Sequence, residues 1–531
     1  MPLFKRNTLQ SRISGRESEF PVPPDVRRFA PARIGAHTRG SGGNHSPRRG
    51  VGRSPTTMTT SSSLPCFKAY DVRGRVPLEL NLELVRHIGL AFAAEFAPTT
   101  VAVGYDVRHS SRDFTLVLAS ALQDGGADVV NIGLCGTEEV YQAVAGQGLD
   151  GGIMITASHN PKDWNGMKFV RRGAVPVSAD SGLHALRDRI LAGNLPIALR
   201  RGGYERKNLR KEYVTALLRF LGLTPEQASA VAEGEGPGLE AGRAALAGFA
   251  GFSIVADAGN GCAGPVLEEL GKLLPCRLII LRGEPDGDFP HGVPNPLLPE
   301  NRDFTAKAVR EHGADLGIAF DGDFDRCFFF DETGAFIENY YMVGLLAQYL
   351  LDRSPGEKII YDSRLTWNTM EMVAEAGGTA IESKTGHAFM KERMRAENAL
   401  YGGEMSGHHY FRDFAFCDGG MPPWLVLLAL LRKKGASLSS LLRDRMNKFP
   451  VSGELNRSVA TPQAIMKRVE NRHSPKAKSV THIDGLSVEF ENARFNLRMS
   501  NTEPLLRLNV ESRADPALME SLRDEILAEM R

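Results

Sequence analysis

The sequence predicts an α/β protein built from three similar α/β domains and a smaller C-terminal α+β domain around a central cleft. From Cys66 onward, short β-rich runs alternate with helical patterns, which is typical of α/β units with largely parallel strands. Three of these runs end in a carboxylate, at Asp106, Asp257 and Asp321. Because parallel sheets place ligands at the C-terminal ends of their strands, the three ends suggest three related modules that face one cleft.

The first 64 residues differ in composition from the rest of the chain. They are rich in Arg, Ser, Thr, Gly and Pro, contain 11 Lys/Arg against 3 Asp/Glu, and show no apolar periodicity. Such a composition predicts a disordered basic extension over residues 1–64. An organelle-targeting peptide and a nucleic-acid-binding arm stay open as alternatives, although the Pro and Gly clusters oppose an amphipathic helix.

The rest of the chain holds 53 basic against 60 acidic residues and is mildly acidic, which gives no electrostatic reason to expect nucleic acid or a membrane as partner. The longest apolar runs are too short to cross a bilayer. The six cysteines are scattered without a metal-binding spacing, as expected of reduced thiols in a cytoplasmic enzyme. The oligomeric state is not predicted.

With 531 residues and 42% hydrophobic content, the chain is long enough for roughly three or four domains. We place the first domain at residues 65–208, the second at 209–314, the third at 315–440 and the fourth at 441–531. The fourth region contains strand-like runs at Gly485 to Phe490, Ala493 to Arg498 and Leu505 to Glu511, followed by a helical pattern to the C-terminus. This order predicts a small α+β domain.

The first motif with chemical potential spans Thr156 to Pro161. It places Ser158 and His159 in a loop directly after an apolar run that ends at Ile155, with Lys168 shortly after. A serine beside a histidine and a lysine can be a nucleophile with its own proton-transfer partners. The alternative is an Asn-Pro turn with a capping serine.

The second motif places three carboxylates, Asp321, Asp323 and Asp325, at alternate positions in a short loop. Such a loop gathers oxygen ligands around one hard cation, and the glycine after the first Asp lets the backbone bend. An EF-hand loop needs Gly at position six and Glu at position twelve; Arg326 at position six excludes that interpretation, although position twelve is Glu332. A solvated acidic turn is the other alternative, but three adjacent acids repel one another without a cation.

The third motif runs from Gly402 to His409 and contains Glu404 and Ser406. These side chains can accept and donate hydrogen bonds to the vicinal hydroxyls of a sugar ring. A transition-metal site at the adjacent histidines, His408 and His409, is the alternative.

The fourth motif supplies two guanidiniums, hydroxyls and loop amides, which together can meet the oxygens of a phosphate group. An exposed polar turn is the alternative. Its candidate residues are Arg498, Ser500, Asn501, Thr502 and Arg507.

Together, the four motifs resemble the α-D-phosphohexomutase family in the order and spacing that the family uses. The resemblance covers nearly the whole chain from Cys66 and includes the segments Phe67 to Gly74 and Ser383 to His387. The stretches Asp323 to Asp331 and Gly407 to Asp413 are similar to the bacterial phosphomannomutases within this family. One departure is Phe324, where many members carry Gly, and this leaves the backbone shape of the loop open.

The resemblance implies specific roles for the motif residues. It implies a phosphoserine at Ser158 and one Mg²⁺ held by that phosphate together with Asp321, Asp323 and Asp325. It implies catalytic contacts for His159, Lys168, Arg73 and Arg326. The implied substrate contacts are Tyr70, Arg364, His387, Glu404, Ser406, His408, Arg498, Ser500, Asn501, Thr502 and Arg507.

The activity that the resemblance implies is the interconversion of mannose 6-phosphate and mannose 1-phosphate, which supplies GDP-mannose synthesis. The phosphoryl group would pass through the phosphoserine, with a hexose 1,6-bisphosphate as intermediate and activator. Phosphoglucomutase, dual specificity and phosphoglucosamine mutase are alternatives within the family. A metal-dependent sugar phosphatase and a non-catalytic sugar-phosphate binder are alternatives of another class.

Overall fold

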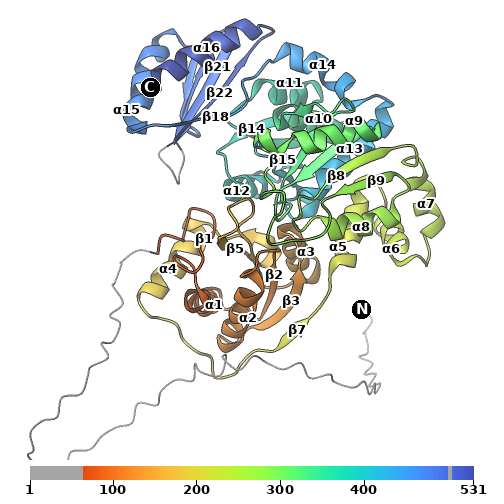
Figure 1. The fold of residues 1–531 in the computed structure, drawn as a ribbon, viewed down its shortest axis with the longest axis vertical. Coiled ribbons are helices and arrows are strands. Elements are labelled where there is room, and N and C mark those ends of the chain that lie inside the picture. The colour runs from red at the N-terminus through yellow and green to blue at the C-terminus, as the bar shows by residue number, and fades with distance from the viewer. Residues whose placement is uncertain (1–63, 500–504, 531) are drawn as a thin grey trace, which may run out of the picture. The chain divides into compact units, whose positions relative to one another are not determined.

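The computed structural model describes residues 64–499 and 505–530, which belong to the unit Ser61–Arg531 (Figure 1). The extension predicted to be disordered, residues 1–64, lies outside the described residues apart from Leu64. All six cysteines are buried and free. No helix within the described ranges is long and apolar enough to span a bilayer.

The first sheet has seven strands and forms the N-terminal α/β module. Its order is β1 (Val72–Arg75), β5 (Trp164–Arg171), β4 (Gly151–Ile155), β2 (Thr100–Tyr105), β3 (Asp128–Leu134) and β7 (Tyr204–Arg206), and β6 (Val175–Pro176) pairs with β5. The module's helices are α1 (Leu82–Phe96), α2 (Ser111–Asp124), α3 (Thr137–Gln147) and α4 (His184–Leu191). The Asn81 side chain caps α1 by accepting a hydrogen bond from the Leu84 amide, and Leu84, Ile88 and Phe92 lie on its buried face.

The second sheet has five strands. Its order is β12 (Phe336–Ile337), β11 (Cys327–Phe330), β10 (Leu316–Phe320), β8 (Ser253–Asp257) and β9 (Arg277–Leu281). The helices of this region are α5 (Arg210–Leu218), α6 (Pro225–Glu233), α7 (Leu239–Ala247), α8 (Gly264–Leu273) and α9 (Asp303–His312). Strand β10 is fully buried, as expected for an interior strand of a largely parallel sheet.

The third sheet also has five strands. Its order is β14 (Thr379–Ser383), β13 (Lys358–Asp362), β15 (Tyr401–Gly403), β16 (His409–Phe411) and β17 (Cys417–Asp418). The helices are α10 (Asn339–Leu351), α11 (Trp367–Glu375), α12 (His387–Glu397), α13 (Met421–Lys434) and α14 (Leu438–Lys448). One large apolar core includes α10, α13 and side chains of the second sheet, so these two modules are packed together.

These three sheets share one plan, which confirms the predicted three similar α/β domains. In each sheet a central strand, β2, β8 or β13, pairs in parallel with strands on both sides. One of these neighbours, β4, β10 or β15, then pairs antiparallel with the next strand of the chain. The loops containing Ser158, Asp321 to Asp325, and Glu404 to His408 all follow that neighbour, so three of the four motifs occupy equivalent places.

The three carboxylates at strand ends are not equivalent in the way that the sequence suggested. Asp106, Asp257 and Asp362 follow or end the central strands, and each accepts a hydrogen bond from the amide two residues later. Asp321 instead follows β10, a different strand of the sheet that contains Asp257. The internal repeat is therefore marked by Asp362, while Asp321 belongs to a motif loop.

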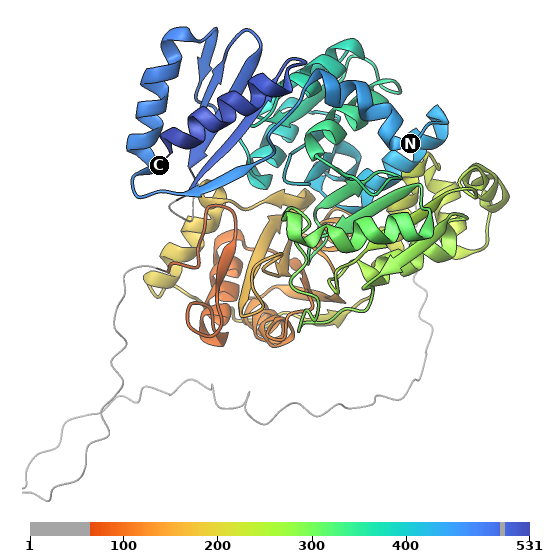
Figure 2. The ribbon, with the colours of Figure 1, turned by 45° about the horizontal axis from the view of Figure 1, so that its top comes forward.

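The fourth sheet is antiparallel, with the order β18 (Leu455–Ser458), β22 (Leu505–Ser512), β21 (Ala493–Met499), β20 (Leu486–Glu489) and β19 (Ser479–Thr481). Helices α15 (Pro462–His473) and α16 (Pro516–Glu529) pack against β20, β21 and β22 (Figures 1 and 2). This module has an apolar core of its own. The predicted small α+β domain is confirmed.

Two predicted domain boundaries need correction. A boundary between residues 314 and 315 would separate β10 from its parallel neighbour β8, so the loop from Asp321 to Asp325 belongs to the second module and not to the third. A boundary between 440 and 441 would cut α14, which packs against α10 of the third module. Both errors arise because a strand or helix looks the same in the sequence on either side of a domain boundary.

Candidate active site

Ser158 occupies a constrained position in the loop between β4 and β5. Its φ is +51°, a left-handed conformation that costs a non-glycine residue of order 1 kcal/mol and is found most often at functional sites. The side chain is buried, and its Oγ donates to Oδ2 of Asp321 at 2.6 Å and lies 3.0 Å from Nδ1 of His159. The hydroxyl thus faces a carboxylate of another module, which favours the nucleophile over the capping serine.

Two arginines hold the loop of Ser158. Arg108 donates to the backbone carbonyls of Ser158 at 2.9 Å and Asn160 at 2.5 Å, and its own amide and guanidinium contact Asp106. Arg73 donates to Oδ1 of Asn160 at 2.7 Å. Sequence reasoning missed Arg108, although its position two residues after a carboxylate that follows a strand was a usable signal.

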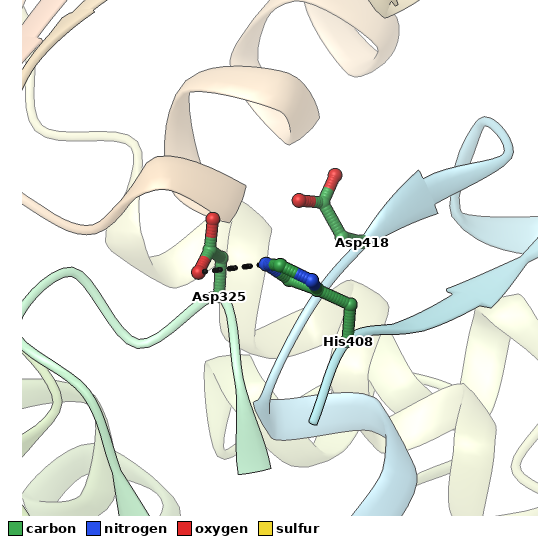
Figure 3. Close-up of side chains that lie close together, drawn as sticks. All are labelled: Asp325, His408 and Asp418. Atoms are coloured by element: carbon green, nitrogen blue, oxygen red, sulfur yellow. Dashed lines mark ion pairs between the residues drawn. The ribbon is translucent and has the colours of Figure 1, made fainter. Parts of the chain in front are cut away.

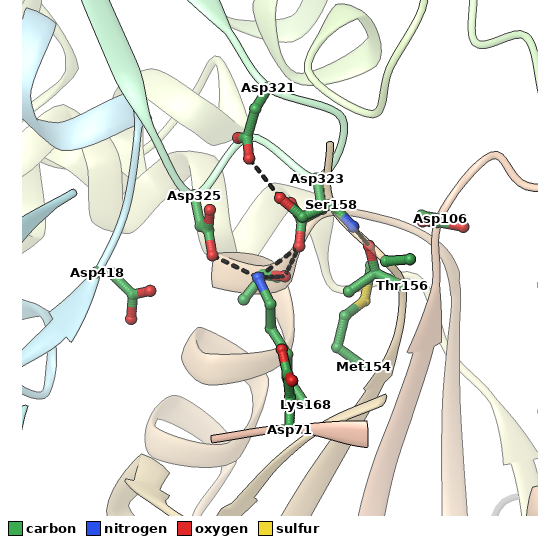
Figure 4. Close-up of polar contacts among 12 residues, drawn as sticks. Asp71, Asp106, Met154, Thr156, Ser158, Lys168, Asp321, Asp323, Asp325 and Asp418 are labelled. Carbon is green, nitrogen blue, oxygen red and sulfur yellow. Dashed lines mark hydrogen bonds and ion pairs between the residues drawn. The ribbon is translucent and has the colours of Figure 1, made fainter. Parts of the chain in front are cut away.

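The side chains of Asp321, Asp323 and Asp325, here called the carboxylate cluster, are buried together (Figure 4). Lys168 inserts its ammonium group between two of them, 2.7 Å from Asp323 and 2.5 Å from Asp325. Thr137 donates from its Oγ1 to Asp323 at 2.5 Å. Burial alone would lower the pKa of Lys168, but the two carboxylates outweigh burial and raise it, so this lysine is charged.

The carboxylate cluster fits a divalent cation. The three side chains can each offer an oxygen within 4.8 Å of the others. Oδ1 of Asp323 and Oδ1 of Asp325 are buried and accept no hydrogen bond within the described ranges. Burial, followed by repulsion from Asp325 and Asp323, raises the pKa of Asp321 to about 7. Hard oxygen ligands with excess negative charge are the donor set that Mg²⁺ or Ca²⁺ prefers.

A second group of possible ligands, Asp325, His408 and Asp418, shares one carboxylate with this cluster (Figure 3). Asp418 is already paired with the buried ammonium of Lys391 at 2.7 Å. His409 does not join His408, because its ring nitrogens contact the Tyr401 hydroxyl at 2.6 Å and the Asn339 side chain at 3.2 Å. A transition-metal site at the adjacent histidines is therefore not favoured.

Glu404 and His408 form an ion pair in the loop between β15 and β16. Nδ1 of His408 lies 3.2 Å from Oε2 of Glu404 and 3.2 Å from Oγ of Ser406, and its Nε2 lies 3.5 Å from Oδ1 of Asp325. Burial and Arg326 oppose the charged ring, but Asp325 and Glu404 outweigh them and raise the pKa of His408 to about 9. The imidazolium thus joins the loop between β15 and β16 to the carboxylate cluster.

The remaining predicted contacts lie around these two loops. Arg326 places its Nε 3.8 Å from Asp321, and the Tyr70 ring meets the His387 ring edge-on with centroids 5.5 Å apart. Both ring nitrogens of His387 are buried without a hydrogen-bond partner among the described residues. Burial, with Arg326 and Arg73 nearby, keeps the pKa of His159 well below its usual value, so this histidine is neutral.

Three arginines gather around one carboxylate where the third and fourth modules meet. Arg364, Arg498 and Arg507, here called the arginine cluster, lie 3.3, 2.7 and 3.0 Å from the oxygens of Glu454. Arg364 also pairs with Asp362 at 2.6 Å. The predicted contacts Ser500, Asn501 and Thr502 lie outside the described residues. Sequence reasoning missed Glu454, which stands in none of the four motifs.

A line of polar contacts joins the two clusters. It runs from Asp325 to His408 and Glu404, then from Oε1 of Glu404 to Arg364 at 3.8 Å, and from Arg364 to Glu454. The carboxylates of the second module are thus connected, through the loop between β15 and β16 of the third module, to arginines of the third and fourth modules. Such a site can hold an anionic ligand with a group at each end.

Comparisons with known proteins define the class. Four family models named phosphoglucomutase/phosphomannomutase match this chain: α/β/α domain I at residues 65–193, domain II at 242–334, domain III at 338–449, and the C-terminal domain at 454–529. The chain therefore belongs to the phosphoglucomutase/phosphomannomutase family, the α-D-phosphohexomutases.

Individual relatives show which members of the family this chain is similar to. A phosphomannomutase of Salmonella montevideo is 52% identical over 476 residues, covering 88% of this chain and 99% of the relative. A phosphomannomutase of Escherichia coli K12 is 51% identical over 468 residues, covering 86% and 97%. The crystal structure of a family protein from Burkholderia thailandensis superposes with a TM-score of 0.75 at 31% identity, covering 88% of this chain and 97% of that one. The chain is thus close to the bacterial phosphomannomutases.

Proposed function

We propose that this protein is a phosphomannomutase that interconverts mannose 6-phosphate and mannose 1-phosphate through a phosphorylated Ser158. The observation that carries the proposal is the buried Ser158 hydroxyl, 2.6 Å from Asp321 of another module. The similarity to proteins named phosphomannomutase supports the choice of mannose over glucose.

Mg²⁺ is the cation that suits this site, held by Asp321, Asp323, Asp325 and the phosphate on Ser158. When bound, it would neutralise charge on the transferring phosphoryl group. The Oδ1 atoms of Asp323 and Asp325, which are buried and accept no hydrogen bond from the part of the chain that the structure describes, support this assignment.

In the first transfer, the bond between phosphorus and Oγ of Ser158 breaks while a bond forms to O1 of mannose 6-phosphate. Arg326 and Lys168 offset the negative charge of the phosphoryl group and of the carboxylates beside it. The O1 proton must leave as this bond forms. Oγ of Ser158 takes up a proton as it is released, and neutral His159, 3.0 Å from Oγ, would accept the O1 proton and pass it to Oγ.

The second transfer needs the mannose 1,6-bisphosphate to turn around, so that its 6-phosphoryl group passes to Oγ of Ser158 and mannose 1-phosphate leaves. Glu404, Ser406 and His408 would bind ring hydroxyls in both orientations, with Tyr70 and His387 beside them. The distal phosphate would be held by Arg364, Arg498 and Arg507 together with Ser500, Asn501 and Thr502. A hexose 1,6-bisphosphate would act as activator, because it can rephosphorylate Ser158.

The proposal is tested by comparing kcat/KM for mannose 1-phosphate and glucose 1-phosphate. A preference for mannose is expected, and a preference for glucose would point to a phosphoglucomutase. Net release of inorganic phosphate at the turnover rate would favour a phosphatase. Intact mass should show a phosphorylated fraction that Ser158→Ala lacks.

The buried free thiols suit a reducing compartment, so we place the activity in the cytoplasm.

A further inference from the structure

Glu454 lies among three arginines that the proposed function assigns to the distal phosphate. Its side chain is 9% exposed. Its Oε2 contacts Arg498 at 2.7 Å and Arg364 at 3.3 Å, and its Oε1 contacts Arg507 at 3.0 Å. A carboxylate and a phosphate offer the same kind of paired oxygen acceptors to a guanidinium. Glu454 thus occupies the kind of position that a phosphate would take.

The charge of Glu454 is strongly fixed. Burial alone would raise the pKa of this carboxyl, but Arg498, Arg364 and Arg507 outweigh burial and lower it to about 2. The side chain is therefore an anion at every working pH, as a phosphate is.

Arg364 keeps other anionic partners if Glu454 moves away. Its Nη2 lies 2.6 Å from Asp362 and 3.8 Å from Glu404. Arg498 on β21 and Arg507 on β22, in contrast, have Glu454 as their anionic partner among the described residues. A phosphate that approached these two arginines would have to take them from Glu454.

The main chain next to Glu454 is held by contacts that do not involve its side chain. Glu454 stands between Phe449, at the end of α14, and β18, in a short connection that joins the third module to the fourth. Gly453 before it has a φ of +67°, a conformation that glycine adopts without strain, and Asn509 anchors its carbonyl at 3.1 Å. The main chain is thus held, while the carboxylate depends on the arginines for its place.

We infer that Glu454 is an internal competitor that holds Arg498 and Arg507 in place of the distal phosphate and yields them when a phosphorylated sugar binds. The inference rests on the proposed function, in which the distal phosphate is released and bound again in each cycle. Arg498 and Arg507 are partly buried, with side chains 13% and 30% exposed, and a guanidinium shielded from water costs free energy when it has no anion beside it. Glu454 lowers the free-energy cost of releasing the bisphosphate, because it pairs with the arginines again as the phosphate leaves.

The test is Glu454→Gln, which keeps the size of the side chain and removes its charge. Binding is measured by calorimetry in a Ser158→Ala background, so that no turnover occurs, with mannose 1-phosphate and inorganic phosphate titrated separately. A competitor lowers the apparent affinity for phosphate in proportion to the fraction of molecules in which the arginines are free. Glu454→Gln should therefore bind both probes about threefold to tenfold more tightly. Weaker or unchanged binding would overturn the inference and make Glu454 a residue that positions the arginines.

The matched control is Glu338→Gln, which removes a neighbouring carboxylate whose ion pair is with Arg302 at 3.9 Å and which forms none with the three arginines of the cluster. An equal gain in this variant would also overturn the inference, because the effect would then be general charge. If Glu454→Gln does not fold, Glu454→Asp is tested instead. Because the shorter side chain reaches the arginines less well, affinity for both probes should rise by a smaller factor. No rise in affinity would contradict the competition. If the binding pattern is observed but the protein with Ser158 intact has no mutase activity, the proposed function alone is refuted.

Discussion

The carboxylate cluster and the arginine cluster solve opposite electrostatic problems. In the first, Lys168 pairs with two of the three buried carboxylates, His408 lies 3.5 Å from Asp325, and two carboxylate oxygens accept no hydrogen bond among the described residues. In the second, three arginines share one glutamate that contacts all of them. The carboxylate cluster is thus short of positive charge and suited to a cation, whereas the arginine cluster already contains an anion. Removing a charge should therefore have different consequences at the two places.

The largest expected effect is at the carboxylate cluster. Asp323→Asn removes a charged ligand, and we expect kcat to fall by roughly a thousandfold, since electrostatic stabilisation of the transferring group is lost. Chelation of divalent cations should do nearly the same. The measurement is mutase activity over a Mg²⁺ titration, and undiminished activity in excess EDTA would remove the metal from the mechanism.

Asp331→Asn is the matched control for this prediction. Asp331 is also buried, and its Oδ1 accepts hydrogen bonds from the amides of Thr333 and Ala335, which an Asn can still accept. This variant should keep its activity per folded molecule and its dependence on Mg²⁺. A large loss here would mean that any buried charge in the segment matters, and not the cluster.

The next effect concerns the stability of the same cluster. Lys168→Met leaves Asp323 and Asp325 without their cation, and breaking a buried pair typically costs about 3–5 kcal/mol. We expect this loss in the free energy of unfolding in chelator, with part of it restored by Mg²⁺. Denaturant unfolding with and without Mg²⁺ measures both values.

Lys162→Met is the control, because Lys162 is exposed and pairs only distantly with Asp288, at 3.9 Å. Its loss should stay below about 0.5 kcal/mol in either condition. If Lys168→Met lost the same stability with and without Mg²⁺, the lysine would stabilise the fold by packing. Neutralisation of the carboxylates by both Lys168 and Mg²⁺ would then be excluded as its role.

At the arginine cluster the expected effect is smaller and falls on binding. Arg498→Ala removes a charge-assisted contact of roughly 1.5–3 kcal/mol, so KM should rise about tenfold to a hundredfold. The bisphosphate depends on the same contact while it turns, so more of it should escape, and added hexose 1,6-bisphosphate should restore part of the rate. An unchanged KM with no response to the activator would show that this arginine does not hold the distal phosphate.

Arg472→Ala is the control in the same module. Arg472 lies on α15 and pairs at the surface with Glu525 at 2.8 Å. Its removal lowers the positive charge of the module by the same amount without touching the arginine cluster. KM should therefore stay unchanged, which separates a specific contact from a general effect of charge.

The sequence predicted the features that are local in the chain. The carboxylate cluster spans five residues and the Glu404 to His408 pair spans five, so their side chains are forced together by one short loop. The alternation of β-rich and helical runs likewise predicted three α/β modules and a small α+β domain. What these features share is that a few neighbouring residues determine them.

The features that the sequence did not predict depend on residues far apart. Thr137 reaches Asp323 across 186 positions, and Glu454 reaches Arg364 across 90. The boundary after residue 314 was wrong because β10 resembles the first strand of a new module and only its pairing with β8 shows otherwise. Such contacts require the packing of complete modules, which no local pattern records.

Phe324 shows how a departure from the family pattern is accommodated. This residue stands between Asp323 and Asp325 in the sequence and has a φ of +45°, which glycine would adopt more easily. Its side chain is nevertheless fully buried. The space comes from Gly136 at the start of α3, where an added Cβ would lie 2.1 Å from Cε1 of Phe324. The ring of one module therefore packs on the backbone of another, directly beside the carboxylate cluster.

This packing predicts a coupling that a double-mutant cycle measures. Gly136→Ala should cost about 1–3 kcal/mol by overpacking, and Phe324→Ala about 3–5 kcal/mol by leaving a cavity. Once the ring is gone the added methyl has room, so the double variant should lose at least about 1 kcal/mol less than the two single losses together. If the two single losses in stability add within about 0.5 kcal/mol, glycine is needed at position 136 for its backbone conformation and not for contact with the ring. The carboxylate cluster would then owe its shape to the loop alone, without the contact between modules.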